Sequence, residues 1–288
     1  MKILLLGKNG QLGWELQRTL APLGPLSAFD YEELNLEDFE AVRSTIRALK
    51  PQVIVNASAY TAVDRAENET EKCFAINASI PAILAEEALQ LKAALIHYST
   101  DYVFDGLKGS PYSEQDTPNP LSVYGKSKLA GELAIQVLGG THLIFRTAWV
   151  YSTRRDSFVT KVLQWARQNQ TLRIVDDQVS NPTWARMLAE ISAQTLARGT
   201  DSLRERSGLY HLAGSGHASR LEWARLILEL DPARQEQQVE QILPAQTSEF
   251  PTPAQRPLFS ALNCAHFLES FQIELPAWQP TLRLAMES

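Results

Sequence analysis

Short apolar runs alternate with stretches of helical spacing through the first half of the chain. The apolar runs, which we interpret as strands, are Ile3–Leu6, Leu26–Phe29, Val53–Val55, Ala94–Tyr98 and Leu143–Phe145. The stretches with helical spacing are Leu12–Leu20, Glu37–Leu49, Ala66–Leu91 and Val123–Val137. Strand–helix alternation over short connections predicts parallel strands joined by right-handed crossovers. The near-continuous apolar character of the runs is typical of strands that are covered on both faces.

The alternation continues less regularly after Arg146. Helical spacing recurs at Phe158–Gln168, Met187–Leu196 and Leu221–Leu230, and Leu209–Leu212 is a further strand candidate. The prolines between Pro244 and Pro257 predict a long surface loop. We therefore predict an α/β fold with a doubly wound, mostly parallel, Rossmann-like sheet and a smaller C-terminal α/β domain. We expect residues 1–150 to form a dinucleotide-binding domain and residues 151–288 to form most of a substrate-binding domain, with some later segments returning to the first.

Composition and charge narrow the classes of function. Hydrophobic residues make up 44% and charged residues 21% of the chain, and the net charge of −6 comes without a cluster of Lys or Arg. This pattern disfavours a surface for nucleic acid or for an anionic membrane. The apolar run at the N-terminus is too short for a secretory signal or a membrane span, and Cys73 and Cys264 are isolated. We expect a cytoplasmic protein with reduced thiols and neither a nucleic-acid nor a membrane partner.

A glycine-rich turn follows the first predicted strand and opens the first predicted helix. Its sequence is Gly7-Lys8-Asn9-Gly10-Gln11-Leu12-Gly13. Glycine permits positive φ and lets a pyrophosphate approach the backbone, while the helix N-terminus offers free N–H groups and a partial positive charge. A glycine triplet alone is a weak signal, because any tight strand–helix turn can use one. The strand–turn–helix context is the one that dinucleotide binding requires, so we predict a dinucleotide phosphate site here.

The end of the second predicted strand bears on the choice of cofactor. Asp30 stands where an acidic side chain accepts a hydrogen bond from a ribose 2′-OH and repels a 2′-phosphate, which favours NADH. Lys8 in the turn and Arg43 nearby in sequence could offset that charge. The alternative for Asp30 is a solvated turn aspartate. The sequence leaves NADH and NADPH open.

Tyr124 and Lys128 lie on one face of a predicted helix, because residues four apart are one turn apart. A phenol is a poor base at neutral pH, and a nearby ammonium stabilises the phenolate and eases delivery of its proton. A Ser or Thr hydroxyl in Ser99–Tyr102, which leaves the fourth strand, can hydrogen-bond a substrate oxygen. Tyr-x-x-x-Lys alone can be an ordinary amphipathic pair. Its position before the fifth strand of a glycine-turn domain predicts reduction of a carbonyl.

Other aromatic and imidazole side chains mostly favour a structural interpretation. His97 and His211 lie within predicted strands, His142 begins one, and none of them has a partner at metal-ligand spacing. Most tryptophans are expected in the core or in a pocket wall. Trp149 is the exception, because it follows the fifth strand, where open α/β sheets bind ligands.

On these motifs the chain resembles the dTDP-4-dehydrorhamnose reductases, a family of extended short-chain dehydrogenase/reductases. The G-x-x-G-x-x-G spacing is the variant of that family, and the resemblance covers nearly the whole chain. Besides the glycine turn and Tyr124–Lys128, the segments that carry it are Asn56–Asp64, Ser99–Phe104, Phe145–Tyr151, Asp177–Thr183 and Pro251–Pro257. The resemblance implies that NADPH or NADH reduces the 4-keto group of dTDP-6-deoxy-L-lyxo-4-hexulose to give dTDP-L-rhamnose.

The resemblance also implies roles for individual residues. Thr100 would bind the keto oxygen, Tyr124 would donate the proton, and Lys128 would bind the nicotinamide ribose and lower the pKa of the tyrosine. The expected cofactor contacts are Gly7, Asn9, Gly10, Gln11, Leu12, Gly13, Asp30, Asn35, Leu36, Ala57, Ser58, Ala59, Tyr60, Tyr124 and Lys128. The expected substrate contacts are Thr100, Asp101, Tyr102, Trp149 and Arg256. Arg256 would hold the diphosphate with a bidentate guanidinium, and its alternative is a surface arginine in a proline-rich loop.

Two departures from the family pattern affect these expectations. Ser58 stands where the family often has alanine, a change that the site is expected to tolerate. Some relatives hold Mg²⁺ between subunits through glutamates, and Glu15 fits one of those positions. Arg186 stands where another is expected, and an arginine repels a cation. We therefore expect no metal and no dimer built on one, which leaves a monomer and a homodimer open.

Two other functions are compatible with the motifs. The first is a different nucleotide-sugar reductase, or an epimerase that would retain its NAD and consume none. The second is a non-catalytic partner that resembles the regulatory subunit of methionine adenosyltransferase. The intact set of Thr100, Tyr124 and Lys128 favours catalysis.

Overall fold

A six-stranded parallel sheet forms the centre of the computed structural model, which describes residues 1–274 and 276–287. The strand order is β10-β5-β4-β3-β1-β2. The strands are β1 (Ile3–Leu6), β2 (Leu26–Phe29), β3 (Val53–Asn56), β4 (Ala94–Thr100), β5 (His142–Thr147) and β10 (Gly208–His211). All neighbouring pairs are parallel, and the order reverses between β1 and β3. The predicted doubly wound, Rossmann-like sheet is confirmed.

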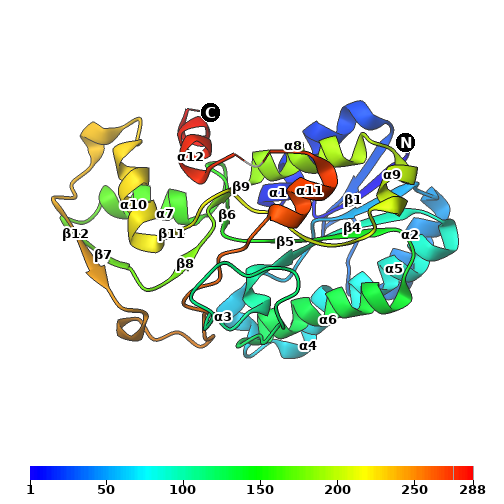
Figure 1. The fold of residues 1–288 in the computed structure, drawn as a ribbon, viewed down its shortest axis with the longest axis horizontal. Helices are drawn as coiled ribbons and strands as arrows, with labels where there is room; N and C mark the ends of the chain where they lie inside the picture. Colours follow the sequence, from blue (N-terminus) through cyan, green and yellow to red (C-terminus); the bar gives the residue numbers. More distant parts are fainter. Residues whose placement is uncertain (275, 288) are drawn as a thin grey trace.

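Helices cover both faces of this sheet (Figure 1). One face carries α1 (Gln11–Leu20), α8 (Ala185–Leu196) and α11 (Ala265–Phe271), and the other carries α2 (Phe39–Leu49), α5 (Ile80–Leu91) and α6 (Val123–Leu138). Alternate side chains of one strand serve the two layers, because neighbouring residues point to opposite faces. Ile3 and Leu5 of β1 belong to the cluster with α1 and α8, whereas Leu4 and Leu6 belong to the cluster with α2 and α5.

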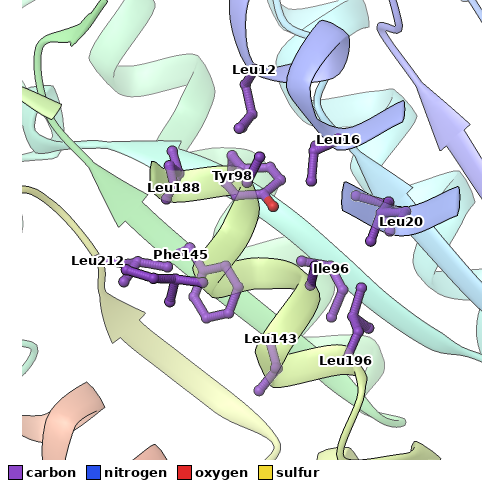
Figure 2. Close-up of a cluster of buried hydrophobic side chains, with 14 of the residues drawn as sticks. Leu12, Leu16, Leu20, Ile96, Tyr98, Leu143, Phe145, Leu188, Leu196 and Leu212 are labelled. Atoms are coloured by element: carbon purple, nitrogen blue, oxygen red, sulfur yellow. The ribbon is translucent and has the colours of Figure 1, made fainter. Parts of the chain in front are cut away.

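The first of these clusters joins early and late parts of the chain. Figure 2 shows Leu16 of α1 and Leu188 of α8 on either side of Tyr98, a residue of the central strand β4. The Tyr98 hydroxyl is buried and donates to Ser192 Oγ of α8 at 2.7 Å, so the polar end of the ring has a partner. Segments from the second half of the chain therefore complete the core of the sheet.

The remaining segments form a smaller unit beside the end of the sheet from which β5 continues into β6 (Figure 1). Its strands and helices are β6 (Val150–Tyr151), α7 (Phe158–Ala166), β7 (Thr171–Val175), β8 (Val179–Ser180), β9 (Thr183–Trp184), β11 (Ala218–Ser219), α10 (Arg220–Glu229), β12 (Gln241–Ala245) and α12 (Trp278–Met286). Buried side chains of this unit, including Tyr151 and Trp223, form a separate core. In contrast, β10 is a strand of the central sheet, and α8, α9 (Thr200–Glu205) and α11 lie against that sheet. Among the described residues, no helix has the length and apolarity needed to cross a membrane.

The helix predicted over Ala66–Leu91 is confirmed from Thr70 to Leu91, but it is not regular, and a turn at residues 67–69 precedes it. The structure has α3 (Val63–Ala66), α4 (Thr70–Phe74), a π-helical stretch at Ala75–Ser79, and then α5. Pro81 in the first turn of α5 has no N–H to donate. The Asn77 side chain bonds both the N–H and the carbonyl of Tyr60, at 2.8 and 3.1 Å. These two features interrupt the regular helix, as is common where helices serve a nearby site.

The predicted loop from Pro244 to Pro257 is also only partly correct. β12 includes Pro244 and pairs with β7, and a 3-10 turn follows at Thr247–Glu249. A proline is tolerated there because this two-stranded sheet leaves one edge of β12 unpaired.

Candidate active site

A cleft of 710 Å³ follows the carboxyl edge of the central sheet from the glycine turn to α6. Of the site residues expected from the sequence, those that line it are Gly7, Gly10, Gln11, Leu12, Asp30, Asn35, Leu36, Ala57, Ser58, Ala59, Thr100, Asp101, Tyr124, Lys128 and Trp149. Those outside its lining are Asn9, Gly13, Tyr60, Tyr102 and Arg256. The cleft lies at the point where the strand order reverses, which is where doubly wound sheets bind ligands.

Backbone atoms form the glycine-turn end of the cleft. Gly7 has a φ of +83°, and a Cβ added there would lie 2.7 Å from the Ser58 nitrogen. A Cβ on Gly13 would lie 1.9 Å from the Gly7 carbonyl oxygen, so the turn packs directly on the first helical turn. Gly10 caps α1 without a side-chain hydrogen bond, and the first turn of α1 has no acidic residue. This open, backbone-lined helix N-terminus fits a pyrophosphate.

The Asp30 carboxylate is held beside this turn by backbone donors. It accepts from the N–H of Asn9 at 2.7 Å and from that of Tyr31 at 2.8 Å. Lys8 forms an ion pair with Glu33 and keeps the pKa of that carboxyl below its ordinary value.

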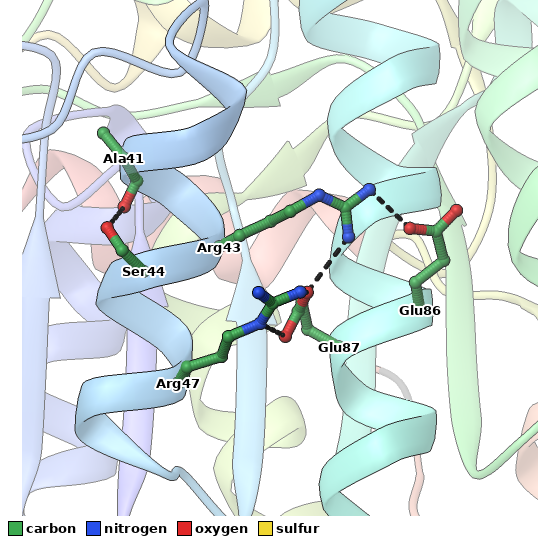
Figure 3. A network of polar contacts seen from close by, with 6 residues as sticks. All are labelled: Ala41, Arg43, Ser44, Arg47, Glu86 and Glu87. Atoms are coloured by element: carbon green, nitrogen blue, oxygen red, sulfur yellow. Dashed lines mark hydrogen bonds and ion pairs between the residues drawn. The ribbon is translucent and has the colours of Figure 1, made fainter.

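Arg43, the other cation considered from the sequence, is bound elsewhere. It pairs with Glu86 at 2.5 Å and with Glu87 at 3.0 Å, both on α5, beside Arg47 (Figure 3). Neither Lys8 nor Arg43 is therefore free to neutralise Asp30.

Tyr124 lies in the first turn of α6, at the other end of the cleft. Ser122 caps this helix by accepting from the Gly125 N–H at 3.2 Å. A Cβ on Gly125 would lie 2.3 Å from the Tyr102 carbonyl oxygen, so glycine lets α6 begin against the loop after β4. Burial raises the pKa of Tyr124, while its hydrogen bond with Thr100 lowers it. The phenol therefore stays protonated at neutral pH, as a proton donor must be.

Thr100 and Asp101 form a hydroxyl–carboxylate pair beside this phenol. The Thr100 hydroxyl donates to Asp101 Oδ1 at 3.1 Å. The other carboxylate oxygen accepts from Ser180 at 3.0 Å and from Ser260 at 2.5 Å. Burial raises the pKa of Asp101 to about 6, although these three hydroxyls lower it. Asp101 thereby joins the end of β4 to β8 and to the segment around Ser260, and it fixes the position of Thr100.

Lys128 lies one turn after Tyr124 and is 1% exposed. Its ammonium donates to the Tyr98 carbonyl at 2.7 Å and contacts His97 Nε2 at 3.2 Å. Burial lowers the pKa of Lys128 to about 8. Within the described residues, the polar contacts of this amino group run to β4 and none runs to the Tyr124 hydroxyl.

Trp149 lines the cleft where it meets the smaller unit, and Arg220, which is outside the cleft lining, packs on the Trp149 ring. Trp149 has a φ of +41°; the other non-glycine residues with positive φ in the described chain cap the ends of helices. Such strain is typical of residues that a site holds in place. The Arg220 guanidinium lies 3.6 Å above the Trp149 ring and, among the described residues, forms no ion pair; burial lowers its pKa to about 10, while the nearby Tyr102 and Asp101 act in the other direction. Arg256, by contrast, pairs with both oxygens of Asp64, at 3.0 and 2.7 Å.

Sequence reasoning missed Arg220 and also Arg155. Arg155 lines the cleft and donates to the Asn9 carbonyl of the glycine turn. Its neighbour Arg154 stacks 3.6 Å above Trp14 of α1. The pair Arg154-Arg155 soon after the fifth strand is a weak signal in the sequence, and nothing marks Arg220 except its place before a predicted helix.

The two positions considered for a metal site, Glu15 and Arg186, take part in other interactions. Arg186 pairs with Glu190 at 2.8 Å, and Glu15 lies close enough to raise the pKa of that arginine further. Over residues 1–274 and 276–287, no three His, Cys, Asp or Glu side chains gather as metal ligands would.

Comparisons with known proteins agree over the whole chain. The family described as "RmlD substrate binding domain" matches residues 1–288. The chain is 43% identical to the dTDP-4-dehydrorhamnose reductase of Escherichia coli K12 over 284 residues, which cover 97% of this chain and 95% of the relative. A solved dTDP-4-dehydrorhamnose reductase from Clostridium acetobutylicum has a TM-score of 0.91 and 34% identity, with coverage of 100% and 99%. Another from Bacillus anthracis, in complex with NADP, has a TM-score of 0.89 and 31% identity, with full coverage of both chains.

Proposed function

This chain belongs to the RmlD substrate binding domain family, and on that premise we propose that it reduces dTDP-6-deoxy-L-lyxo-4-hexulose to dTDP-L-rhamnose with NADPH or NADH. The observation that carries the proposal is the position of Tyr124, Thr100 and Lys128 in the same cleft as the glycine turn. One cleft can then bring a nicotinamide and a keto group together.

The dinucleotide is held by the backbone of the glycine turn and by the N-terminus of α1. Arg155 adds a guanidinium beside that turn, and Lys128 has an N–H left for the nicotinamide ribose. When bound, the reduced nicotinamide supplies the hydride that reaches the carbonyl carbon. Asp30 and the pairing of Lys8 with Glu33 support a preference for NADH, because the 2′-phosphate of NADPH would meet an acidic surface.

The protein supplies the proton that the carbonyl oxygen takes up. Tyr124 is neutral and buried, so it can donate its hydroxyl proton as negative charge develops on that oxygen. Thr100 can offer a second donor to the same oxygen once its hydroxyl proton turns from Asp101 to the substrate. The positive charge of Lys128 stabilises the tyrosinate that remains, until a proton returns from solvent.

The nucleotide part of the substrate is held where the smaller unit meets the sheet. Trp149 provides an aromatic face that lines the cleft, and Arg220, packed on that ring, provides a positive charge that, among the described residues, no ion pair engages. We assign the substrate diphosphate to Arg220, because a guanidinium already neutralised by a carboxylate gains less from a second anion. Arg256 then serves to fix its own loop on Asp64. In this assignment residues 1–150 bind the cofactor and also supply Thr100, Tyr124 and Trp149 to the substrate, and residues 151–288 supply Arg220.

The proposed setting is the cytoplasm, where reduced cofactor is available and where Cys73 and Cys264 stay as the free thiols that the structure has. The test is an assay of NADH and NADPH oxidation with dTDP-6-deoxy-L-lyxo-4-hexulose, followed by identification of the product. Stoichiometric cofactor oxidation with formation of dTDP-L-rhamnose is expected. Retained NAD with no net oxidation would favour an epimerase, and lack of any turnover together with co-purification of a larger enzyme would favour a regulatory subunit.

A further inference from the structure

A row of polar side chains leads from the loop after β3 into the interior, as far as Lys128. It consists of Ser58, Asn56 and His97, and the chemistry described above does not use it. Asn56 and His97 are each 1% exposed, so their polar atoms have no access to solvent. Polar atoms buried in this way need protein partners, which constrains the direction of each hydrogen bond.

The backbone N–H of Ser58 sets that direction. It lies 3.2 Å from Asn56 Oδ1, and the Ser58 hydroxyl donates to the same oxygen at 2.5 Å. Because a backbone N–H can only donate, the amide oxygen of Asn56 must face Ser58 and its NH₂ group must face His97. Asn56 Nδ2 lies 3.1 Å from His97 Nδ1, so Nδ1 must accept.

A histidine that accepts at Nδ1 carries its proton on Nε2 when it is neutral. Burial, and then the charge of Lys128, lower the pKa of His97 well below its ordinary value, so the ring is neutral at physiological pH. His97 Nε2 lies 3.2 Å from Lys128 Nζ. The row of hydrogen bonds therefore presents an N–H group to the lysine.

An ammonium group has three N–H donors and no lone pair, so it cannot accept from that N–H, whereas a neutral amine can. The contact with His97 thus favours the neutral form of Lys128, in the same direction as burial. Two groups act the other way, namely Glu132 one turn further along α6 and Cys73 on α4. Arg146 of β5 pairs with Glu132 at 2.6 Å, which limits how strongly that carboxylate holds the lysine proton.

We propose that His97 is a positioning residue of the reductase, held by Asn56 with its Nε2–H toward Lys128 so that the lysine can release its proton readily beside Tyr124. The kinetic consequence rests on the proposed function, whereas the tautomer of His97 does not. The ammonium form of Lys128 is the one that stabilises the tyrosinate. Reduction should therefore slow as pH rises through the pKa of Lys128, which is about 8.

The first test is the tautomer of His97 in the cofactor-free protein, measured from the imidazole ¹⁵N shifts. The wild type is expected to carry the proton on Nε2. In Asn56→Asp the new carboxylate can only accept, so the proton should move to Nδ1. In Ser58→Ala the backbone N–H remains, so the proton should stay on Nε2. A wild-type ring protonated on Nδ1 would overturn the proposal.

The second test is the basic limb of the pH profile of kcat/KM. Asn56→Asp leaves the Nε2 lone pair facing Lys128 and adds a negative charge, so the limb should move up by about one pH unit, which is a tenfold change in proton affinity. Asn68→Asp adds the same charge at an exposed position and should not move it. If Asn56→Asp does not fold, His97→Gln replaces it, because a glutamine carbonyl can accept from the ammonium.

The two tests separate this inference from the proposed function. A uniform loss of rate with an unmoved limb would show that His97 is only a structural residue, and would contradict the inference. If the wild type reduces no 4-keto sugar, the proposed function fails, while the ¹⁵N measurement still decides whether His97 presents an N–H to Lys128.

Discussion

The two ends of the cleft are constructed differently. At the glycine turn the binding groups belong to the backbone of one continuous segment, Gly7–Gly13. At the catalytic end they are side chains from separate elements, with Tyr124 and Lys128 on α6, His97 on β4 and Asn56 on β3. The first end depends on the absence of side-chain atoms, and the second depends on the direction of hydrogen bonds. Substitutions that add volume should therefore damage the first end, and substitutions that remove or reverse a hydrogen bond should damage the second.

The largest effect is expected for Tyr124→Phe, which removes the proton donor and keeps the ring. Turnover should fall by at least ~10²-fold while cofactor binding survives, as is usual when a positioned acid is lost. Steady-state rates and cofactor fluorescence titration measure the two quantities. Tyr210→Phe, which removes a hydroxyl that donates to Arg206 away from the cleft, is the matched control. Near-full activity of Tyr124→Phe would eliminate the role proposed for this residue.

The glycine turn offers a contrast between two alanine substitutions. Gly13→Ala would bring a Cβ to 1.9 Å from the Gly7 carbonyl oxygen, and it should lower the free energy of unfolding by about 1–3 kcal/mol, as other overpacked sites do. Gly10→Ala would bring a Cβ only to 3.4 Å from that oxygen, at an ordinary φ of −65°. Its stability should stay close to that of the wild type, while the methyl group weakens pyrophosphate binding.

Denaturant unfolding and cofactor titration distinguish the two variants. Equal loss of stability in both would mean that the turn is a packing feature and not a binding surface.

Arg220→Gln is expected to have a smaller effect, confined to the substrate. The dissociation constant of dTDP should rise about tenfold, the change expected for one charge-assisted contact of about 1.4 kcal/mol. Calorimetry without any cofactor measures it. Arg225→Gln on the exposed side of α10 is the matched control. An unchanged affinity in Arg220→Gln, with a loss in Arg256→Gln, would return the diphosphate to Arg256.

The smallest expected effect concerns the choice between NADH and NADPH. Asp30→Asn keeps an oxygen for the Asn9 N–H but removes the charge that would repel a 2′-phosphate. The ratio of kcat/KM for NADPH to that for NADH should rise about fivefold, or about 1 kcal/mol. Asp201→Asn, at an exposed position on α9, should leave the ratio as it is. A ratio that falls in Asp30→Asn would contradict the assignment of Asp30 to the ribose.

The contrast between groups that are close together in the chain and groups from separate elements also explains how much the sequence could predict. The sheet, the glycine turn and the Tyr124–Lys128 pair follow from local periodicity and spacing, since each depends on residues close together in the chain. Arg220 at the start of α10, and Ser180 of β8 and Ser260, which hold Asp101, are distant in the sequence, and only the fold brings them to the site.

His97 is the clearest case of a residue that local pattern misses. As one histidine in an apolar strand it predicts a structural role, and nothing local indicates that Asn56 and Lys128 lie on either side of the ring. The interruption of the helix expected over Ala66–Leu91 has the same origin, because it depends on a contact between Asn77 and Tyr60.

Transfer of label tests the central claim most directly. The protein would be given NADH deuterated at the transferable nicotinamide position together with dTDP-6-deoxy-L-lyxo-4-hexulose, and the product would be analysed by mass spectrometry and NMR. The account predicts dTDP-L-rhamnose with a single deuterium on sugar C4 for each NADH oxidised. A product without deuterium, or label at another carbon, would contradict hydride delivery to a keto group that Tyr124 protonates.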